Sequence, residues 1–168
     1  QAVRGQLTDH YDPRTKTVNL SEPVYASSSV SAIGVAAHEC GHAIQDHVGY
    51  APLRLRAAFV PVANLGSTLS WPLILLGLVI GLTPFIQVGI WMFVLALLFQ
   101  VITLPVEFNA SGRAVQLLGQ LGILQGQEVA DTRRVLGAAA LTYVAAVAAS
   151  VLQLLRLLIL FGGRRRDD

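Results

Sequence analysis

The chain has 168 residues, of which 54% are hydrophobic and only 13% are charged. This balance is typical of a membrane protein and argues against a soluble domain. A net charge of +2 gives no electrostatic reason to expect a nucleic-acid partner, and the single cysteine fits a reducing compartment.

The N-terminal segment carries turn residues and one short strand. Residues 8–13 end in the turn sequence Asp12-Pro13. The short alternating run Lys16–Leu20 predicts a strand, which Glu22-Pro23 ends.

The next segment, residues 30–48, has apolar residues at helical spacing and contains His38-Glu39-Cys40-Gly41-His42. Side chains four positions apart lie on one face of a helix, so His38 and His42 can bind the same metal ion. Glu39 projects beside that ion, where it can hold a water molecule as a general base. Cys40 lies off the ligand face and is interpreted as a packing residue, with a redox or inhibitory role as the alternative. The pattern predicts a catalytic zinc site.

Catalytic zinc usually takes a third protein ligand, for which Glu107 is the strongest candidate. It follows a tract from Ala57 to Val106 without a single Asp, Glu, Lys or Arg. A carboxylate at the edge of such a tract must be solvated, paired or bound to a metal. The alternative is that Glu107 only stabilises the N-terminus of a helix that starts near Pro105. His47 faces away from the histidine pair.

The uncharged tract is long enough for two membrane-spanning helices, expected at 62–80 and 85–104 with a turn at residues 81–84. Two spans return the chain to its starting side, so the histidines and Glu107 can meet at one metal. The active site is therefore expected at the membrane surface.

A third apolar tract runs from Val135 to Phe161 and is interrupted by Arg156. Either the span is Val135–Leu155, with Arg156 at the interface, or a tilted helix continues towards the basic cluster Arg164–Arg166.

Motifs over most of the chain resemble the YugP-type neutral zinc metallopeptidases, which are bacterial membrane proteins of the gluzincin kind. The segments that carry the resemblance are 7–18, 20–25, 34–39, 41–45, 49–53, 69–72 and 104–108. The resemblance implies that His38, His42 and Glu107 bind Zn²⁺ and that Glu39 is the general base. Related membrane gluzincins often have an acidic residue four positions after the glutamate ligand, where this chain has Ser111. The family also usually carries an N-terminal anchor, so the chain, which begins at Gln1, is expected to be a fragment or a processed product.

Other polar side chains are candidates for supporting roles. Peptide hydrolysis develops charge on the carbonyl oxygen, and the candidates to stabilise it are His10, Tyr11, Tyr25 and Arg113. The alternatives are turn formation for His10 and Tyr11, and membrane-surface anchoring for Arg113. Asp46 and Ser111 are candidates to hold the far nitrogens of the ligand histidines.

The strand at 16–20 has two interpretations. Thermolysin-like proteases bind substrate by adding its backbone to an edge strand near the zinc, and this strand could supply such an edge. Alternatively, it pairs internally with residues that precede Gln1.

The sequence thus predicts a mainly α, integral-membrane helical protein with a small zincin-like α+β N-terminal domain. We expect a metal-binding segment at 1–60, a two-span hairpin at 61–104, a third-ligand helix and connector at 105–134, and a third span with a basic tail at 135–168.

The expected function is that of a membrane-bound zinc metalloendopeptidase, acting on membrane-associated proteins at the bilayer surface through zinc-activated water. The resemblance implies a multi-pass protein of the bacterial inner membrane, and arginines near the span ends favour a cytoplasmic active site. One alternative is a zinc-dependent scaffold that binds a partner membrane protein without hydrolysis. Another is an intramembrane protease, which fits less well because the polar residues 45–47 follow the motif directly.

Overall fold

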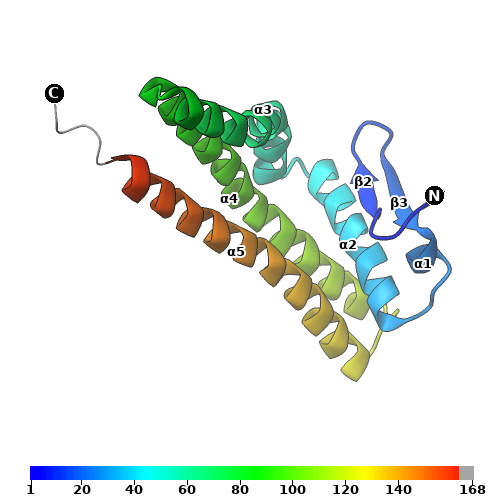
Figure 1. Cartoon of the computed structure of the whole chain (residues 1–168). Helices are drawn as coiled ribbons and strands as arrows, with labels where there is room; N and C mark the ends of the chain where they lie inside the picture. The colour runs from blue at the N-terminus through cyan, green and yellow to red at the C-terminus, as the bar shows by residue number, and fades with distance from the viewer. Residues whose placement is uncertain (163–168) are drawn as a thin grey trace. The chain divides into compact units, whose positions relative to one another are not determined.

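The computed structural model describes residues 1–162 (Figure 1). Within them, the chain is mainly helical, with three long helices and a small three-stranded N-terminal sheet, which confirms the expected fold class. It divides into two compact units: one joins residues 1–54 to 104–142, and the other joins 55–103 to the chain from residue 143. The basic cluster Arg164–Arg166 lies outside the described residues.

The sheet of the first unit has the strand order β1-β3-β2. β2 (His10–Asp12) and β3 (Thr17–Ser21) form an antiparallel hairpin, and β1 (Ala2–Val3) pairs with β3 in parallel. The Asp12 carboxylate closes the hairpin turn, because it accepts hydrogen bonds from the backbone N–H of Arg14 and the hydroxyl of Thr15.

β3 is therefore the middle strand of the sheet, and the prediction that it offers a free edge is wrong. The terminal amine of Gln1 donates to the carbonyl of Val18 at 2.8 Å, and the carbonyl of Gln1 accepts from the backbone N–H of Leu20 at 2.8 Å. The strand pairs internally, as the alternative interpretation holds, but with residues 1–3 and 10–12.

After the short helix α1 (Glu22–Tyr25), helix α2 spans Val30–His47 and carries the two histidines. Its N-terminus is capped by Ser29, whose hydroxyl accepts from the backbone N–H of Ala32. Its C-terminus turns at Gly49, which has a φ of +65°. The buried residues of α2 include Glu39, His42 and Gln45. This helix therefore buries polar and ionisable side chains as well as apolar ones.

Helix α4 spans Thr83–Gln120 without interruption. The sequence predicts a helix start near Pro105, and this is wrong, because Pro105 lies inside α4. A proline inside a helix removes one backbone hydrogen bond, but long apolar helices tolerate this loss when neighbouring groups satisfy the freed carbonyl. The span expected at 85–104 and the third-ligand helix are thus one helix.

Helix α5 spans Gln127–Gly162 and follows α4 after the connector 121–126. Gly122 and Gly126 give this connector its positive φ angles of +67° and +52°. In the first unit, Ala114 and Val115 of α4 form a core cluster with Leu136 of α5. α5 continues through Arg156, which matches the longer of the two alternatives for this segment.

In the second unit, α3 (Ala51–Ile80) packs closely on the first half of α4. A Cβ added at Gly66 would lie 2.5 Å from the carbonyl of Met92, and one added at Gly89 would lie 2.7 Å from that of Ser70. The turn between α3 and α4 falls at Gly81, as expected. Small residues let apolar helices approach this closely.

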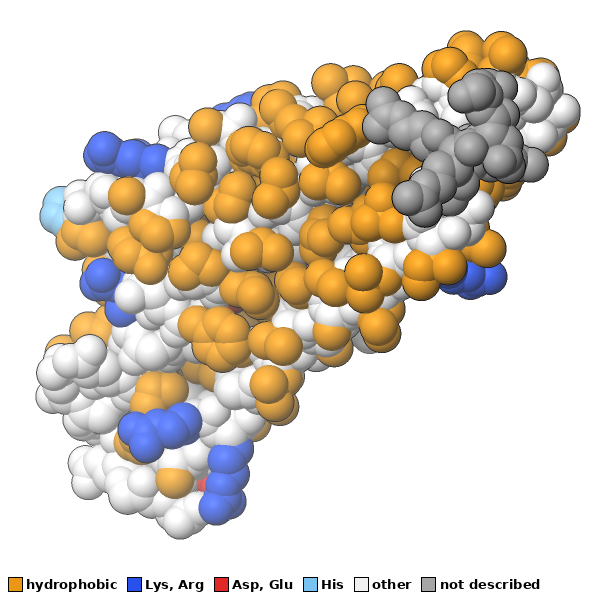
Figure 2. Space-filling model, turned by 90° about the vertical axis from the view of Figure 1, so that its left-hand side faces the viewer, with side chains coloured by type: hydrophobic (Ala, Val, Ile, Leu, Met, Phe, Trp, Pro, Cys, Tyr) orange, Lys and Arg blue, Asp and Glu red, His pale blue; other side chains and the backbone are white. Residues whose placement is uncertain are grey.

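All three long helices, α3, α4 and α5, are long and apolar enough to cross a membrane. Large hydrophobic side chains remain exposed on them, among them Trp91 at 67% and Leu152 at 68%. Hydrophobic side chains also predominate on the face drawn in Figure 2. Exposed apolar surface of this extent is typical of contact with lipid.

Candidate metal centre

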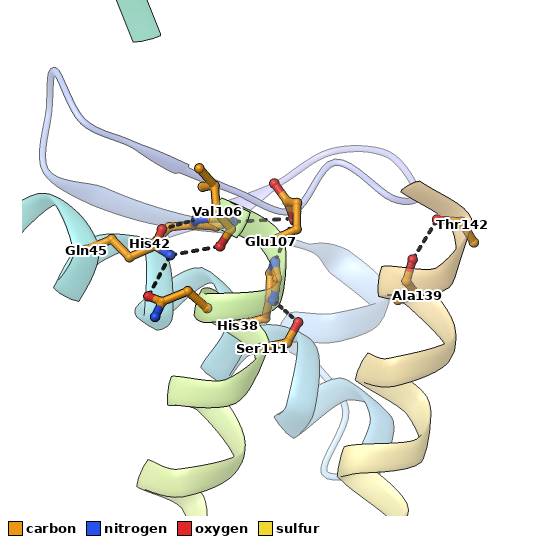
Figure 3. Close-up of polar contacts among 9 residues, drawn as sticks. His38, His42, Gln45, Val106, Glu107, Ser111, Ala139 and Thr142 are labelled. Carbon is orange, nitrogen blue, oxygen red and sulfur yellow. Dashed lines mark hydrogen bonds and ion pairs between the residues drawn. The ribbon is translucent and has the colours of Figure 1, made fainter. Parts of the chain in front are cut away.

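The structure brings together the side chains of His38, His42 and Glu107 (Figure 3). Nε2 of His38 lies 3.3 Å from Oε2 of Glu107, and Nε2 of His42 lies 3.8 Å from the same oxygen. One ligand atom from each residue lies within 4.8 Å of the other two. This cluster could hold one metal ion.

Two helices of the first unit position these ligands. The histidines are one turn apart on α2, and Glu107 lies on α4 next to the fully buried Val106. The two helices touch at Gly41, where an added Cβ would lie only 2.6 Å from the carbonyl oxygen of Ala110. The close approach that this glycine permits brings Glu107 within reach of both imidazoles.

Zinc suits the donor set. Tetrahedral zinc holds imidazole and carboxylate ligands at about 2.0–2.2 Å, which places its ligand atoms roughly 3.3–3.5 Å apart. The observed separations of 3.3 and 3.8 Å lie close to that spacing. Two imidazoles with one carboxylate also form a known catalytic zinc set, with one position open for water or substrate.

Gln45 fixes the imidazole of His42. Its amide nitrogen donates to the carbonyl of Val106 at 2.8 Å and to Oδ1 of Asn109 at 3.0 Å. Its amide oxygen must therefore face Nδ1 of His42, 3.0 Å away, and accept a hydrogen bond from it. A proton on Nδ1 leaves the lone pair of Nε2 for a metal.

Ser111 stands beside the other imidazole. Its Oγ lies 3.1 Å from Nδ1 of His38, one helical turn after Glu107. If the serine hydroxyl accepts, Nε2 of His38 carries the lone pair on the side of Glu107. Ser111, a candidate from the sequence to hold a ligand histidine, thus lies beside Nδ1 of His38.

Burial and charge set the protonation of the site. Burial alone lowers the pKa of His42, but the hydrogen bond and the charge of Glu107 outweigh it, so the pKa lies above its ordinary value. The carboxylate of Glu107, only 3% exposed as a residue, thus favours positive charge at this point. A divalent cation would supply that charge.

Glu39 is buried beside this cluster. Burial raises its pKa above the ordinary value, while the nearby His42 and His38 pull it down. The backbone N–H of Tyr11 on β2 also acts on this carboxylate and favours its ionised form. A raised pKa makes Glu39 a better proton acceptor near neutral pH.

Asp46, a candidate to hold His42, lies elsewhere. Its Oδ2 accepts from the hydroxyl of Tyr11 at 2.6 Å and from the ammonium of Lys16. Lys16 lowers the pKa of Asp46, whereas burial together with Asp46 raises the pKa of Tyr11 to about 12. The cluster ties the β2–β3 hairpin to the last turn of α2.

The remaining candidates lie on three different elements. His10 on β2 has Nδ1 2.8 Å from the carbonyl of Thr8 and Nε2 3.3 Å from the amide nitrogen of Asn19. Tyr25 is 61% exposed at the end of α1. Arg113 on α4 donates from Nε to Oδ1 of Asn109 at 2.8 Å, so it joins the network that reaches His42 through Gln45.

Sequence reasoning missed Gln45 and Asn109. The available signal was their spacing: Gln45 lies three positions after His42, and Asn109 lies two after Glu107. These spacings alone do not show whether the amide side chain is buried in the site or exposed to solvent.

Comparisons with known proteins bear on this site. Residues 1–162 match the family described as "Putative neutral zinc metallopeptidase". The chain belongs to this family. The metallopeptidase is 49% identical over 168 residues to a Bacillus subtilis protein described as "Putative membrane protease YugP", covering 100% of this chain and 75% of that protein. No solved structure matches the metallopeptidase.

Proposed function

We propose that the chain is a membrane-bound zinc metalloendopeptidase that hydrolyses peptide bonds of membrane-associated proteins at the bilayer surface. The observation that carries this proposal is the convergence of His38, His42 and Glu107, with Glu39 buried beside them. The family match supports zinc as the metal and peptide hydrolysis as the reaction.

Bound zinc would polarise the scissile carbonyl and make water acidic enough to ionise near pH 7. The carboxylate of Glu39 would accept the proton of the attacking water and deliver it to the leaving amine. Gln45 and Ser111 would keep the two imidazoles oriented, so that Nε2 of each remains a ligand atom. Among the stabiliser candidates, Tyr11 has its backbone beside Glu39.

Substrate backbone could add to β2. Among the described residues, β2 pairs only with β3, so its other edge is not used in the sheet. The backbone N–H of Tyr11 on β2 acts on the Glu39 carboxylate, which places this strand beside the general base. We therefore move the proposed substrate edge from β3 to β2.

The setting of the enzyme is part of the proposal. The metal-binding segment at 1–60 and the third-ligand segment at 105–134 would work outside the bilayer, which 61–104 and 135–168 would cross. Arg54, Arg56 and Arg113 near the ends of the apolar tracts favour a cytoplasmic face of a bacterial inner membrane. A membrane-associated protein or peptide would be the substrate, and a membrane-protein partner is compatible with the exposed apolar helices.

The variant Glu39→Gln tests the proposal. It keeps the size of the side chain and all three ligands but removes the proton acceptor, so zinc content should stay near one ion per chain. Cleavage of casein should fall by about 10³-fold or more, because the remaining groups cannot activate water. The purified full chain in detergent is assayed, with a chelator as the metal-free control. Zinc binding without cleavage in the unaltered chain would instead favour the non-catalytic scaffold.

A further inference from the structure

A cavity of about 620 Å³ lies between the second half of α4 and the first half of α5, within the first unit. We call it the α4–α5 groove; its α4 wall includes Phe108, Ser111 and Val115, and its α5 wall includes Val129, Arg133 and Leu136. Its volume falls in the range of about 300–1,000 Å³ that is usual for ligand sites.

Glycines inside the helices keep the groove open. A Cβ added at Gly112 on α4 or at Gly137 on α5 would meet nothing within 4 Å. Neither residue has a positive φ, and neither lets two backbones touch. Glycine within a helix costs about 1 kcal/mol relative to alanine. Their physical effect at these positions is therefore to leave space along the groove.

The groove borders a side chain of the metal centre through Ser111. Ser111 lines the groove, and its hydroxyl lies 3.1 Å from Nδ1 of the ligand His38. Phe108, which also lines it, directly follows the ligand Glu107. A polypeptide cleaved at the metal must extend away from it on both sides, and the groove offers one such path.

The groove carries a positive charge and no negative one. Arg133 lines it, and none of its lining residues is acidic. Within residues 1–162, no acidic side chain forms an ion pair with Arg133, whereas its neighbour Arg134 pairs with Asp131 at 3.3 Å. The side-chain amide of Gln116 offers further hydrogen bonds to a polypeptide backbone.

We infer that the α4–α5 groove is a substrate subsite, which binds an apolar stretch of the polypeptide and an acidic residue opposite Arg133. This inference rests on the proposed peptidase function and assigns part of its specificity. Phe108, Val115 and Leu136 contact the apolar side chains, and Arg133 pairs with the carboxylate.

The helices set the distance of the acidic residue from the cleaved bond. A Cβ at Gly119 would meet Val129 at 3.9 Å, so these positions are level on the two helices. Because α4 and α5 form an antiparallel hairpin, Arg133 is level with Val115, eight positions beyond Glu107. Eight helical residues rise about 12 Å, which an extended polypeptide covers in about four residues.

The first experiment tests the charge preference with quenched fluorescent peptides that share an apolar sequence. Each peptide carries Glu or Lys four residues from the cleaved bond, on one side or the other. The zinc-loaded full chain should cleave one Glu peptide better than its Lys counterpart. Arg133→Glu should shift that ratio of kcat/KM by about tenfold towards Lys, because it replaces attraction with repulsion. The matched control is Arg134→Glu, which makes the same charge change outside the groove and should leave the ratio within about twofold. An unchanged ratio in Arg133→Glu, or an equal shift in both variants, overturns the inference.

The volume arm uses Gly137→Leu, which adds a large side chain to the groove wall at a position where a Cβ meets nothing within 4 Å. It should raise KM about tenfold or more for peptides with large apolar residues and much less for alanine-rich ones. Ala138→Leu adds the same side chain on an exposed position of α5 and serves as the control. Equal effects of the two variants, or equal effects on both peptide types, would count against the groove.

A binding arm separates the two proposals. Fluorescence anisotropy of the same peptides on the zinc-loaded Glu39→Gln variant measures affinity without turnover. The double variant Glu39→Gln/Arg133→Glu should lose the preference for the Glu peptide. If the unaltered chain cleaves no peptide, the proposed function fails, yet this measurement still decides on the groove. If cleavage occurs and neither Arg133→Glu nor Gly137→Leu changes the preference among peptides, only the subsite is refuted.

Discussion

Gln45 is fully buried and connects the two helices of the metal centre. Its amide contacts His42 on α2 and both Val106 and Asn109 on α4. All three contacts depend on one side chain, so its loss leaves several buried polar groups without partners.

We predict that Gln45→Leu weakens zinc binding by about 10- to 100-fold, because Nδ1 of His42 loses its acceptor. The free energy of unfolding should fall by about 1–3 kcal/mol for the same reason. Competition with a chelator measures the first effect and chemical denaturation the second. The control is Gln6→Leu at an exposed position, and equal zinc affinity in both variants would contradict the prediction.

Asp46 provides a pH-dependent contribution to stability. The hydrogen bond from Lys16 holds the pKa of Asp46 below its ordinary value of 3.8. A depressed pKa stabilises the folded chain above pH 3.8, and this contribution is lost as the pH falls below that value. The difference in unfolding midpoint between the unaltered chain and Asp46→Asn should therefore be constant near pH 6–7 and shrink below about pH 4. A difference in unfolding midpoint that grows as the pH falls would refute this prediction.

The sequence predicts the candidate metal ligands better than the side chains that hydrogen-bond to them. Two imidazoles four positions apart on a helix must share a face, whatever surrounds them. The partner of each imidazole depends on how α2 meets α4, and spacing alone does not encode this packing. Hence Asp46, one turn after His42, is the obvious candidate, while the structure has Gln45 beside the ring.

At the scale of elements, the contact of α2 with α4 determines whether the ligands meet. We predict that Gly41→Ala pushes these helices apart, because the new Cβ would lie 2.6 Å from the Ala110 carbonyl oxygen. Zinc affinity should fall at least tenfold and stability by about 1–3 kcal/mol. Gly112→Ala, where a Cβ meets nothing within 4 Å, should keep zinc affinity. Its free energy of unfolding should rise by up to about 1 kcal/mol. Equal zinc affinity in the two variants would exclude this role for Gly41.

Local patterns predict α2 and β3 well, because a capping serine and an alternating run act within a few residues. Local patterns fail where residues distant in the sequence determine the local structure. Pro105 resembles a helix start but lies inside α4. β1, only two residues long, has no periodicity to detect, so the central position of β3 is not readable from the sequence.

At the scale of the whole molecule, the three long helices are long and apolar enough to cross a membrane. We predict that the full chain stays in the membrane fraction after an alkaline carbonate wash and enters solution only with detergent. Exposed side chains such as Trp91 and Leu152 would otherwise contact water at a large hydrophobic cost. A soluble marker protein should be released by the same wash, and release of the chain with it would argue against membrane insertion.

Cys40 is the single cysteine, is exposed, and lies next to Glu39. It therefore reports on which side of the membrane the metal centre faces. We predict labelling by a membrane-impermeant maleimide in inverted inner-membrane vesicles and not in intact spheroplasts. Neighbouring atoms partly desolvate the exposed Cys40 thiol, and this desolvation, together with the charge of Glu39, raises its pKa. The reaction should therefore be slow at neutral pH and faster at pH 8–9. Cys40→Ser is the unlabelled control, and labelling in spheroplasts would reverse the orientation.

The candidate metal ligands are far apart in the chain, since Glu107 lies 107 − 42 = 65 positions after His42. A metal held by both ends would act as a removable cross-link, much as a disulfide closes a loop but without a redox reaction. Saturating the site at a hundred times the dissociation constant would add about 2.7 kcal/mol to the stability of the folded chain. Metal supply would then govern how long the enzyme persists in the cell as well as how fast it works.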